Sequence, residues 1–317
     1  MKLSIILALL LFGFLFNPIN VFSQGCSDAG LCSFNMVEHD STGTDEMHYT
    51  LGLSNTIGVG DESVLINSTG VEFGANFSDF GIVAKIPFTL TSGTLGQTNG
   101  LGDLTVLLSS KLYSEENLSL SVAGGVKMAT NKADLRNEDD LSMPMVYQTS
   151  NGTNDVIFLL AANIDDWVVS TGLQIPLNRN ENSFIENSAL VEPIPGFSDE
   201  YYLNWKNYQS SKNFKRGSDV MLKIEKYFNV QNDLKLMAGI LPVYRLVESI
   251  YEDYKVNDIT IMNSDGLTLN IIAGLNYKVT EKHTFGLNIG FPVVTREIRA
   301  DGLTRAMVAN VDFKFEL

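Results

Sequence analysis

The stretch that decides the fold runs from residue 47 to residue 59 and reads Met47-His-Tyr-Thr-Leu-Gly-Leu-Ser-Asn-Thr-Ile-Gly-Val59. Every second residue, counted from Met47, is apolar except Asn55, and the residues in between are polar or small. Side chains alternate between two faces along a strand, so this period of two predicts a strand with one oily and one polar face. A helix would need apolar spacings of three and four, which are absent here.

The same alternation recurs along the rest of the chain. One further segment, near residues 155–163, is apolar on both sides, so its register stays open. Together with the first stretch, the segments predict about twelve strands, the others lying near residues 71–77, 80–90, 104–112, 118–128, 167–177, 220–228, 234–240, 267–277, 285–293 and 307–317.

The connections between these strands alternate between tight and long. The tight ones lie at residues 78–79, 114–117, 163–166, 229–233 and 280–282. The long ones lie near residues 60–69, 92–101, 130–153, 179–216, 244–265 and 294–305. Nothing in a β-sandwich requires this alternation, whereas outer-membrane barrels have short periplasmic turns and longer outer loops. Residues 47–317 are therefore expected to form an all-β, antiparallel, up-and-down transmembrane barrel in the outer membrane, with both ends in the periplasm.

The amino-terminal residues 1–24 are expected to be a cleaved export signal. Lys2 precedes an apolar run from Leu3 to Phe16, which is short for a membrane-spanning helix. Residues 25–46 would then form a periplasmic segment, in which an oxidising compartment favours a Cys26–Cys32 disulfide. A lipidated Cys26 and a metal site that joins the two thiols to His39 or His48 are the alternatives, and the spacing fits no zinc pattern. We predict no metal ion and no cofactor.

Charged residues that alternate with oily neighbours are expected to point into the lumen. On the lipid face a Lys or Arg near the bilayer midplane would cost about 2–4 kcal/mol. The expected luminal set is of mixed sign and comprises Glu72, Lys85, Asp103, Lys111, Lys127, Asp219, Lys223, Glu225 and Lys235. The formal net charge of -15 argues against a nucleic-acid partner.

The longest loop contains a short run with helical spacing. Tyr201, Trp205 and Tyr208 would share one face of a helix that starts after a cap at Ser198. We expect this loop to fold over or into the lumen as a constriction, with Tyr202, Phe214 and Arg216 as solute contacts. The alternative is that it packs on the outer rim or in the interfacial aromatic belt.

Catalytic residues are not expected. His39, His48 and His283 fall in the periplasmic segment or at periplasmic strand ends, away from the outer rim where barrel enzymes meet external substrates. The adjacent pairs Asp139-Asp140 and Asp165-Asp166 are interpreted as solvated loop charge, because a catalytic pair needs a held separation and distinct environments. We therefore predict that the protein is not an enzyme.

Two segments resemble the outer-membrane transporters of aromatic (phenol) degradation pathways. The resemblance rests on Gly100-Leu-Gly-Asp-Leu-Thr-Val106, which leads into a strand, and on Val122-Ala-Gly-Gly-Val-Lys-Met128. It covers about residues 80–130. In that family the second strand leads to a proline-containing segment, whereas this chain has Ala129-Thr130-Asn131 there. The final stretch, Val311 to Leu317, is similar to the assembly signal of such barrels, with Leu317 in place of the usual last aromatic residue. The resemblance implies a transporter of small aromatic solutes.

Two functions of different classes follow. The first is a channel or transporter for passive uptake of small, aromatic or weakly polar solutes. The second is a non-conducting structural or surface-interaction barrel that binds lipopolysaccharide or a protein partner, or a periplasmic partner through residues 25–46. In either case the expected partners are outer-membrane lipid, lipopolysaccharide and the barrel assembly machinery. A barrel of about twelve strands is compatible with an open lumen and with a plugged one.

Overall fold

The computed structural model describes residues 47–186, 204–302 and 307–317. Residues 1–46, which include the expected signal, Cys26, Cys32 and His39, lie outside the described residues, as do Tyr201 and Tyr202. In the described part, twelve strands form the wall: β1 Met47–Val59, β2 Leu65–Phe77, β3 Phe80–Gly93, β5 Leu104–Glu115, β6 Leu118–Met128, β7 Asp155–Ile164, β8 Trp167–Pro176, β9 Asp219–Gln231, β10 Leu234–Arg245, β13 Gly266–Thr280, β14 His283–Val294 and β15 Val308–Glu316.

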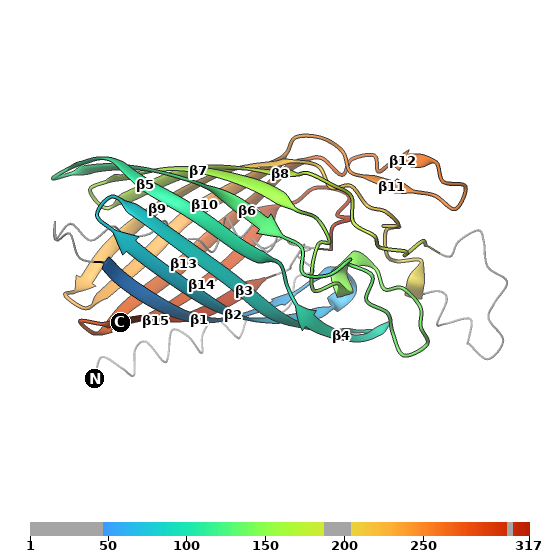
Figure 1. Ribbon diagram of the computed structural model, residues 1–317, viewed down its shortest axis with the longest axis horizontal. Coiled ribbons are helices and arrows are strands. Elements are labelled where there is room, and N and C mark those ends of the chain that lie inside the picture. Colours follow the sequence, from blue (N-terminus) through green and yellow to red (C-terminus); the bar gives the residue numbers. More distant parts are fainter. Residues whose placement is uncertain (1–46, 187–203, 303–306) are drawn as a thin grey trace.

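The wall is a closed, antiparallel, up-and-down barrel. Each strand pairs with the next along the chain, and β1 pairs with β15, from Thr50 opposite Glu316 to Gly58 opposite Val308. The strands cross the barrel at a slant, and the short turns and the carboxyl terminus lie at one end (Figure 1). Closure gives every wall strand two hydrogen-bonded neighbours, so no edge is left unpaired. The predicted fold is confirmed.

The outward face of the wall is an apolar band. Phe73 on β2, Leu108 on β5 and Phe158 on β7 are all exposed. At the short-turn end, the Lys226 ammonium lies 4.8 Å from the Trp167 ring centroid, a contact typical of an interfacial girdle. In β7, Phe158 and Leu160 point outward while Ile157 and Leu159 are buried inside, which fixes the register that the sequence left open.

The outer connections contain more strand than the sequence indicated. Residues 65–69 and 92–101 were expected to be loops, but β2 starts at Leu65, and β3 continues into a hairpin with β4, Gly96–Leu101. The outward faces of these extensions mix the exposed Leu65 and Leu101 with polar residues, and backbone pairing holds them to their neighbours. A second hairpin, β11 Ile250–Glu252 with β12 Asp258–Thr260, projects from the same end (Figure 1). No helix in the described part of the chain is long and apolar enough to cross a membrane.

Candidate functional site: the lumen and its outer mouth

The predicted luminal residues take different places along the barrel. Glu72 and Lys85 stand directly opposite each other on β2 and β3 and are half-buried. Lys223 and Glu225 are buried on β9, with Nζ and Oε2 3.1 Å apart. Lys111 is half-buried near the end of β5, and Lys235 is exposed at the short-turn end of β10. Whether these side chains line a solute path stays a prediction.

Asp103, Lys127 and Asp219 belong to one continuous chain of ion pairs at the outer end of the lumen. We call it the ion-pair ladder; its members alternate in sign and are Asp103, Lys127, Asp155, Arg216, Asp219, Arg245, Asp301 and Arg296. The closest contacts join Arg245 to Asp301 at 2.6 Å and to Asp219 at 2.9 Å. Four acids face four bases, so the ladder carries no net formal charge.

Asp155 is the centre of the ladder. Its Oδ2 lies 3.1 Å from both the Lys127 Nζ and the Arg216 guanidinium, and it also accepts a hydrogen bond from Gln174. The Thr153 hydroxyl donates to Oδ1 at 2.7 Å. Because the side chain has lost its water, these donors replace its hydration and hold the charge in place.

Asp301 reaches the ladder from the loop between β14 and β15. Burial alone would raise the pKa of its carboxyl, but the charges of Arg245 and Arg296 hold the pKa well below the ordinary range for aspartate. The carboxylate thus stays ionised and ties this loop to the inner wall.

Below the ladder, apolar side chains fill one side of the lumen. We call this group the luminal collar; it consists of Val83, Leu107, Ala123, Ile157, Leu159, Met221 and Leu241. Its members point inward from β3, β5, β6, β7, β9 and β10, and none is more than 8% exposed. The collar explains why β7 is apolar on both faces: one face meets lipid and the other meets the collar.

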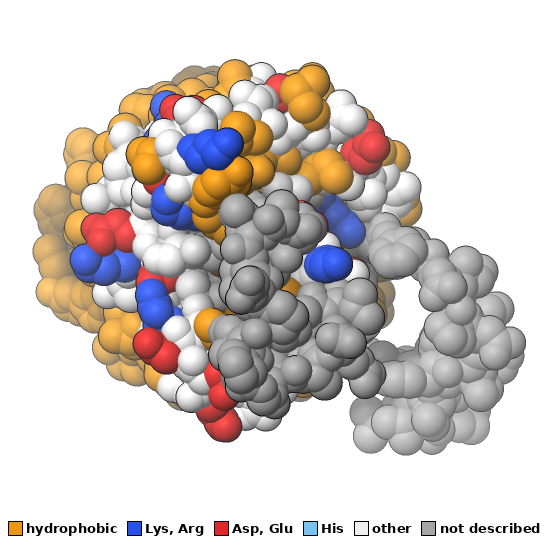
Figure 2. All heavy atoms as spheres, turned by 90° about the vertical axis from the view of Figure 1, so that its right-hand side faces the viewer, with side chains coloured by type: hydrophobic (Ala, Val, Ile, Leu, Met, Phe, Trp, Pro, Cys, Tyr) orange, Lys and Arg blue, Asp and Glu red, His pale blue; other side chains and the backbone are white. Residues whose placement is uncertain are grey.

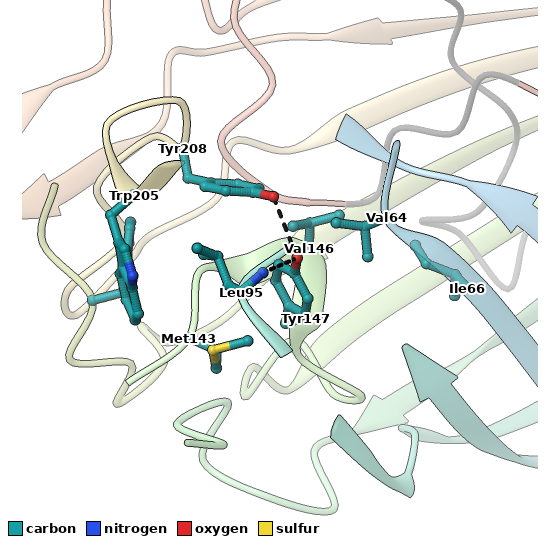
Figure 3. Close-up of a cluster of buried hydrophobic side chains, with 9 residues drawn as sticks. Val64, Ile66, Leu95, Met143, Val146, Tyr147, Trp205 and Tyr208 are labelled. Carbon is teal, nitrogen blue, oxygen red and sulfur yellow. Dashed lines mark hydrogen bonds between the residues drawn. The ribbon is translucent and has the colours of Figure 1, made fainter. Parts of the chain in front are cut away.

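The outer connections pack together in a second apolar group at the outer end of the barrel, the mouth cluster, drawn in Figure 3. It consists of Val64, Ile66, Leu95, Met143, Val146, Tyr147, Phe184, Trp205 and Tyr208. The Tyr147 hydroxyl accepts from the Leu95 amide at 3.1 Å and lies 3.3 Å from the Tyr208 hydroxyl. Residues from four separate connections, β1–β2, β3–β4, β6–β7 and β8–β9, thus meet around one tyrosine.

The Gly-Leu-Gly-Asp motif holds the loop that carries Tyr147. A Cβ on Gly102 would lie 3.0 Å from the Thr149 carbonyl oxygen, so glycine allows this close approach. Asp103 then accepts hydrogen bonds from the Ser150 hydroxyl and from the Asn151 amide, the latter at 3.1 Å. The motif therefore has a structural role in this chain: it holds residues 149–151 in place.

The residues predicted to form a constriction separate into three places. Trp205 and Tyr208 are buried in the mouth cluster, and the Tyr208 amide donates to the Trp205 carbonyl at 3.2 Å, as in a helical turn. Phe214 packs with Ile261 and Ala300 in another apolar group. Arg216 lies in the ladder, so its guanidinium is committed to protein carboxylates.

Several luminal residues escaped sequence reasoning. Asp155 begins β7 on its inward face, but the predicted strand is apolar on both sides and so gave it no orientation; Arg245 ends β10 and lies beyond the predicted strand 234–240, whose alternation would have placed it inward. Asp312 and Lys314 alternate with Val311 and Phe313 on β15 and were equally open to detection. Arg296 and Asp301 lie in a loop without periodicity, and no sequence signal marks them.

The end view of the outer rim shows charges of both signs interspersed (Figure 2). Neither lysine and arginine nor aspartate and glutamate form a single patch over the visible face. At the opposite end of the barrel, His48 is the second residue of β1 and His283 the first residue of β14, and the His283 Nδ1 lies 2.6 Å from the Thr280 hydroxyl. Among the described residues, no three histidine, cysteine or acidic side chains are grouped as metal ligands.

The chain matches no protein-family model and no curated protein. Among solved structures it is similar to the NanC porin (9% identity, 84% of this chain and 100% of that one, TM-score 0.48) and to the KdgM porin (9%, 84% and 99%, 0.43). It is also similar to outer membrane phospholipase A from Escherichia coli (11%, 85% and 96%, 0.38).

These likenesses are distant, and the architecture rests on the chain's own strand register, closure and apolar band. Such a band around a closed barrel is the form that spans the outer membrane. The chain is an outer-membrane β-barrel. The resemblance to the aromatic-degradation transporters stays a prediction from the sequence.

Proposed function

We propose that this barrel is an outer-membrane channel for the passive uptake of small solutes, seen with its outer mouth closed by its own loops. The observation that carries the proposal is the polar inner wall. Glu72 and Lys85 point into a closed barrel midway along their strands and still keep contact with solvent. Water that reaches an inward side chain of a closed barrel lies in its lumen.

The aromatic side chains of the mouth cluster support an aromatic or weakly polar solute. Phe184 stacks on Trp205 with ring centroids 5.4 Å apart, and Tyr147 meets Tyr208 edge to face at 5.9 Å. An aromatic solute could replace one ring of such a pair as the loops separate, because offset-stacked and edge-to-face contacts are energetically similar. The proposed closed state is held by these same contacts.

Flux into proteoliposomes tests the proposal. Trp205→Ala removes a central ring of the mouth cluster and is expected to raise the uptake of xylitol, which does not cross lipid by itself, several-fold over the unmodified protein. Tyr254→Ala, which removes an exposed ring from the β11–β12 hairpin, is the matched control and is expected to leave uptake unchanged. Vesicles that stay sealed with both the unmodified protein and Trp205→Ala would contradict a channel.

A non-conducting barrel is the second candidate, and the ladder and collar favour it. Both are nearly free of water and fill one side of the lumen. In that case the outer loops would bind lipopolysaccharide or a protein partner. Sealed vesicles together with retention of lipopolysaccharide on the immobilised barrel would support this function over uptake.

We also infer that the barrel has no catalytic activity. The inference is supported by the position of His48 and His283 at the short-turn end and by the engagement of Asp155 and Asp301 in ion pairs. Release of fatty acid from phospholipid vesicles that carry the protein, above the level of empty vesicles, would contradict it.

A further inference from the structure

One side of the lumen is built from cross-strand pairs that each join a glycine to a polar residue. These pairs are Thr50–Gly74, Gly52–Glu72, Ser54–Gly70, Gly274–Asn288 and Gly286–Asp312. We call this surface the glycine-polar wall; it comprises inward positions of β1, β2, β13, β14 and β15 and ends at Lys85 on β3.

The polar side chains of this wall lie flat over the glycines. A Cβ built on Gly70 would stand 2.7 Å from the Ser54 hydroxyl, and one built on Gly286 would stand 2.5 Å from the Asp312 carboxylate. Each polar side chain therefore occupies the space that a side chain at the paired position would fill if that residue were not glycine. Since these side chains lie over glycines, they take up less of the lumen than side chains that project toward the barrel axis would.

Water contact separates this wall from the opposite one. Ser54, Asn288 and Asp312 are half-buried although they point inward. On the opposite side, Ile157 is 0% and Leu241 is 1% exposed. The glycine-polar wall is thus hydrated, and the side of the collar is dry.

Hydrogen-bonding groups follow one another along the hydrated wall. The Thr56 hydroxyl donates to the Asn310 side-chain oxygen at 2.8 Å, and the Asn310 amide donates to Asp312 at 3.2 Å. Asn288 donates to the same Asp312 oxygen at 3.4 Å. Hydroxyls and amides both donate and accept, so they can replace the water around a solute that carries such groups.

The formal charges of the wall cancel. Glu72 faces Lys85 across the strands, and the field at Lys85 also includes Asp312 and Lys314. Two acids and two bases give no excess of either sign. Such a surface neither attracts nor repels ions of one sign over the other, and favours uncharged solutes.

We propose that the solute path runs along the glycine-polar wall and takes small uncharged solutes with several hydroxyl or amide groups, while the collar side stays closed. The proposal rests on the proposed channel function and deepens it. It names one side of the lumen as the path and uncharged solutes with several hydroxyl or amide groups as the preferred class.

Cysteine accessibility tests the path. In a Cys26→Ser, Cys32→Ser background, Ser54→Cys and Ser68→Cys place a thiol on the hydrated wall, and Ser121→Cys and Ser170→Cys place one on the buried inner face of β6 and β8. In proteoliposomes, a charged methanethiosulfonate reagent is expected to label the first pair at least tenfold faster, as measured by the mass shift. Labelling of Ser54→Cys is expected to reduce xylitol uptake several-fold.

The outcomes separate the path from the channel. Equal labelling rates at Ser54→Cys and Ser121→Cys, or complete modification of Ser54→Cys without loss of uptake through a conducting protein, would overturn the path and leave the channel standing. Absence of uptake in the unmodified protein and in Trp205→Ala would contradict the channel itself. Channel-dependent uptake of gluconate faster than that of xylitol would overturn the solute class.

Discussion

Asp155 shows how strongly one residue can depend on its neighbours inside the barrel. Replacing it with asparagine leaves Lys127 and Arg216 buried beside a neutral group. Removing one partner of a buried pair is destabilising by about 3–5 kcal/mol, since the remaining charge has lost its water. We expect Asp155→Asn to lower the unfolding free energy by that amount in a urea titration monitored by heat-modifiable gel mobility.

The control for Asp155→Asn is Asp140→Asn. Asp140 is exposed, and its carboxylate lies 3.6 Å from Arg136 on the outer loop. Exposed pairs contribute about 0–1 kcal/mol, so this substitution is expected to leave the titration nearly unchanged. Equal effects of the two substitutions would show that the ladder does not carry the stability assigned to it.

Asp61 makes the outer end sensitive to pH. Burial raises the pKa of this carboxyl to about 6, against the lowering effect of Arg299, whose guanidinium lies 2.9 Å away. A raised folded-state pKa means that the folded protein binds the proton more tightly than the unfolded chain. The contribution of Asp61 to stability is thus fully present below about pH 4, the ordinary value, and is lost as pH rises through 6.

The expected result is a pH-dependent difference between two proteins. The unfolding free energy of the unmodified protein minus that of Asp61→Asn should fall between pH 4 and pH 7, as measured by thermal unfolding in detergent micelles. Arg299→Gln removes the cation that opposes the shift, and should move this fall to higher pH. A difference that stays flat over the whole range would contradict the shift.

At the scale of the strand, the sequence could predict most of the wall and only part of its contents. Lipid meets one face of every strand, so alternation is imposed on β1, β5 or β14 whatever lies inside. The inner face of β7 is part of the collar and is therefore apolar. The sequence of β7 thus lacks the alternation of apolar and polar residues from which the register of a strand is predicted. Arg296 and Asp301 meet the ladder through loop folding, and spacing along the chain holds no information on that contact.

Two neighbouring residues of β7 provide a matched test of the collar. Leu159 is 3% exposed and points inward, whereas Leu160 is 54% exposed and faces outward. Leu159→Ala should cost about 2–5 kcal/mol, because it removes apolar contacts and leaves a cavity. Leu160→Ala loses the transfer of the removed methyl groups from water to lipid, about 2 kcal/mol, but leaves no cavity because lipid fills the space, so it should cost less than Leu159→Ala. Urea unfolding in lipid vesicles measures both, and equal costs would contradict a packed collar.

At the scale of the whole molecule, the alternation of connections fixes how the barrel sits in the membrane. The long connections carry the mouth cluster and the β11–β12 hairpin at one end, while the described ends of the chain, Met47 and Leu317, lie at the other. Leu317 is held there by its amide, which donates to the Tyr49 carbonyl at 3.0 Å. Short turns face the periplasm in such barrels, so the mouth cluster should face the exterior.

Epitope tags can test this orientation on cells. A tag inserted between Tyr254 and Lys255, in the exposed tip of the β11–β12 hairpin, should bind antibody on intact cells. A tag inserted between Asn232 and Asp233, in the tight turn from β9 to β10, should bind only after the outer membrane is permeabilised. Heat-modifiable mobility of both tagged proteins verifies that they are folded. The reverse labelling pattern would place the mouth cluster in the periplasm, and the loops that close it would then control exit from the barrel toward the cell interior instead of entry from outside.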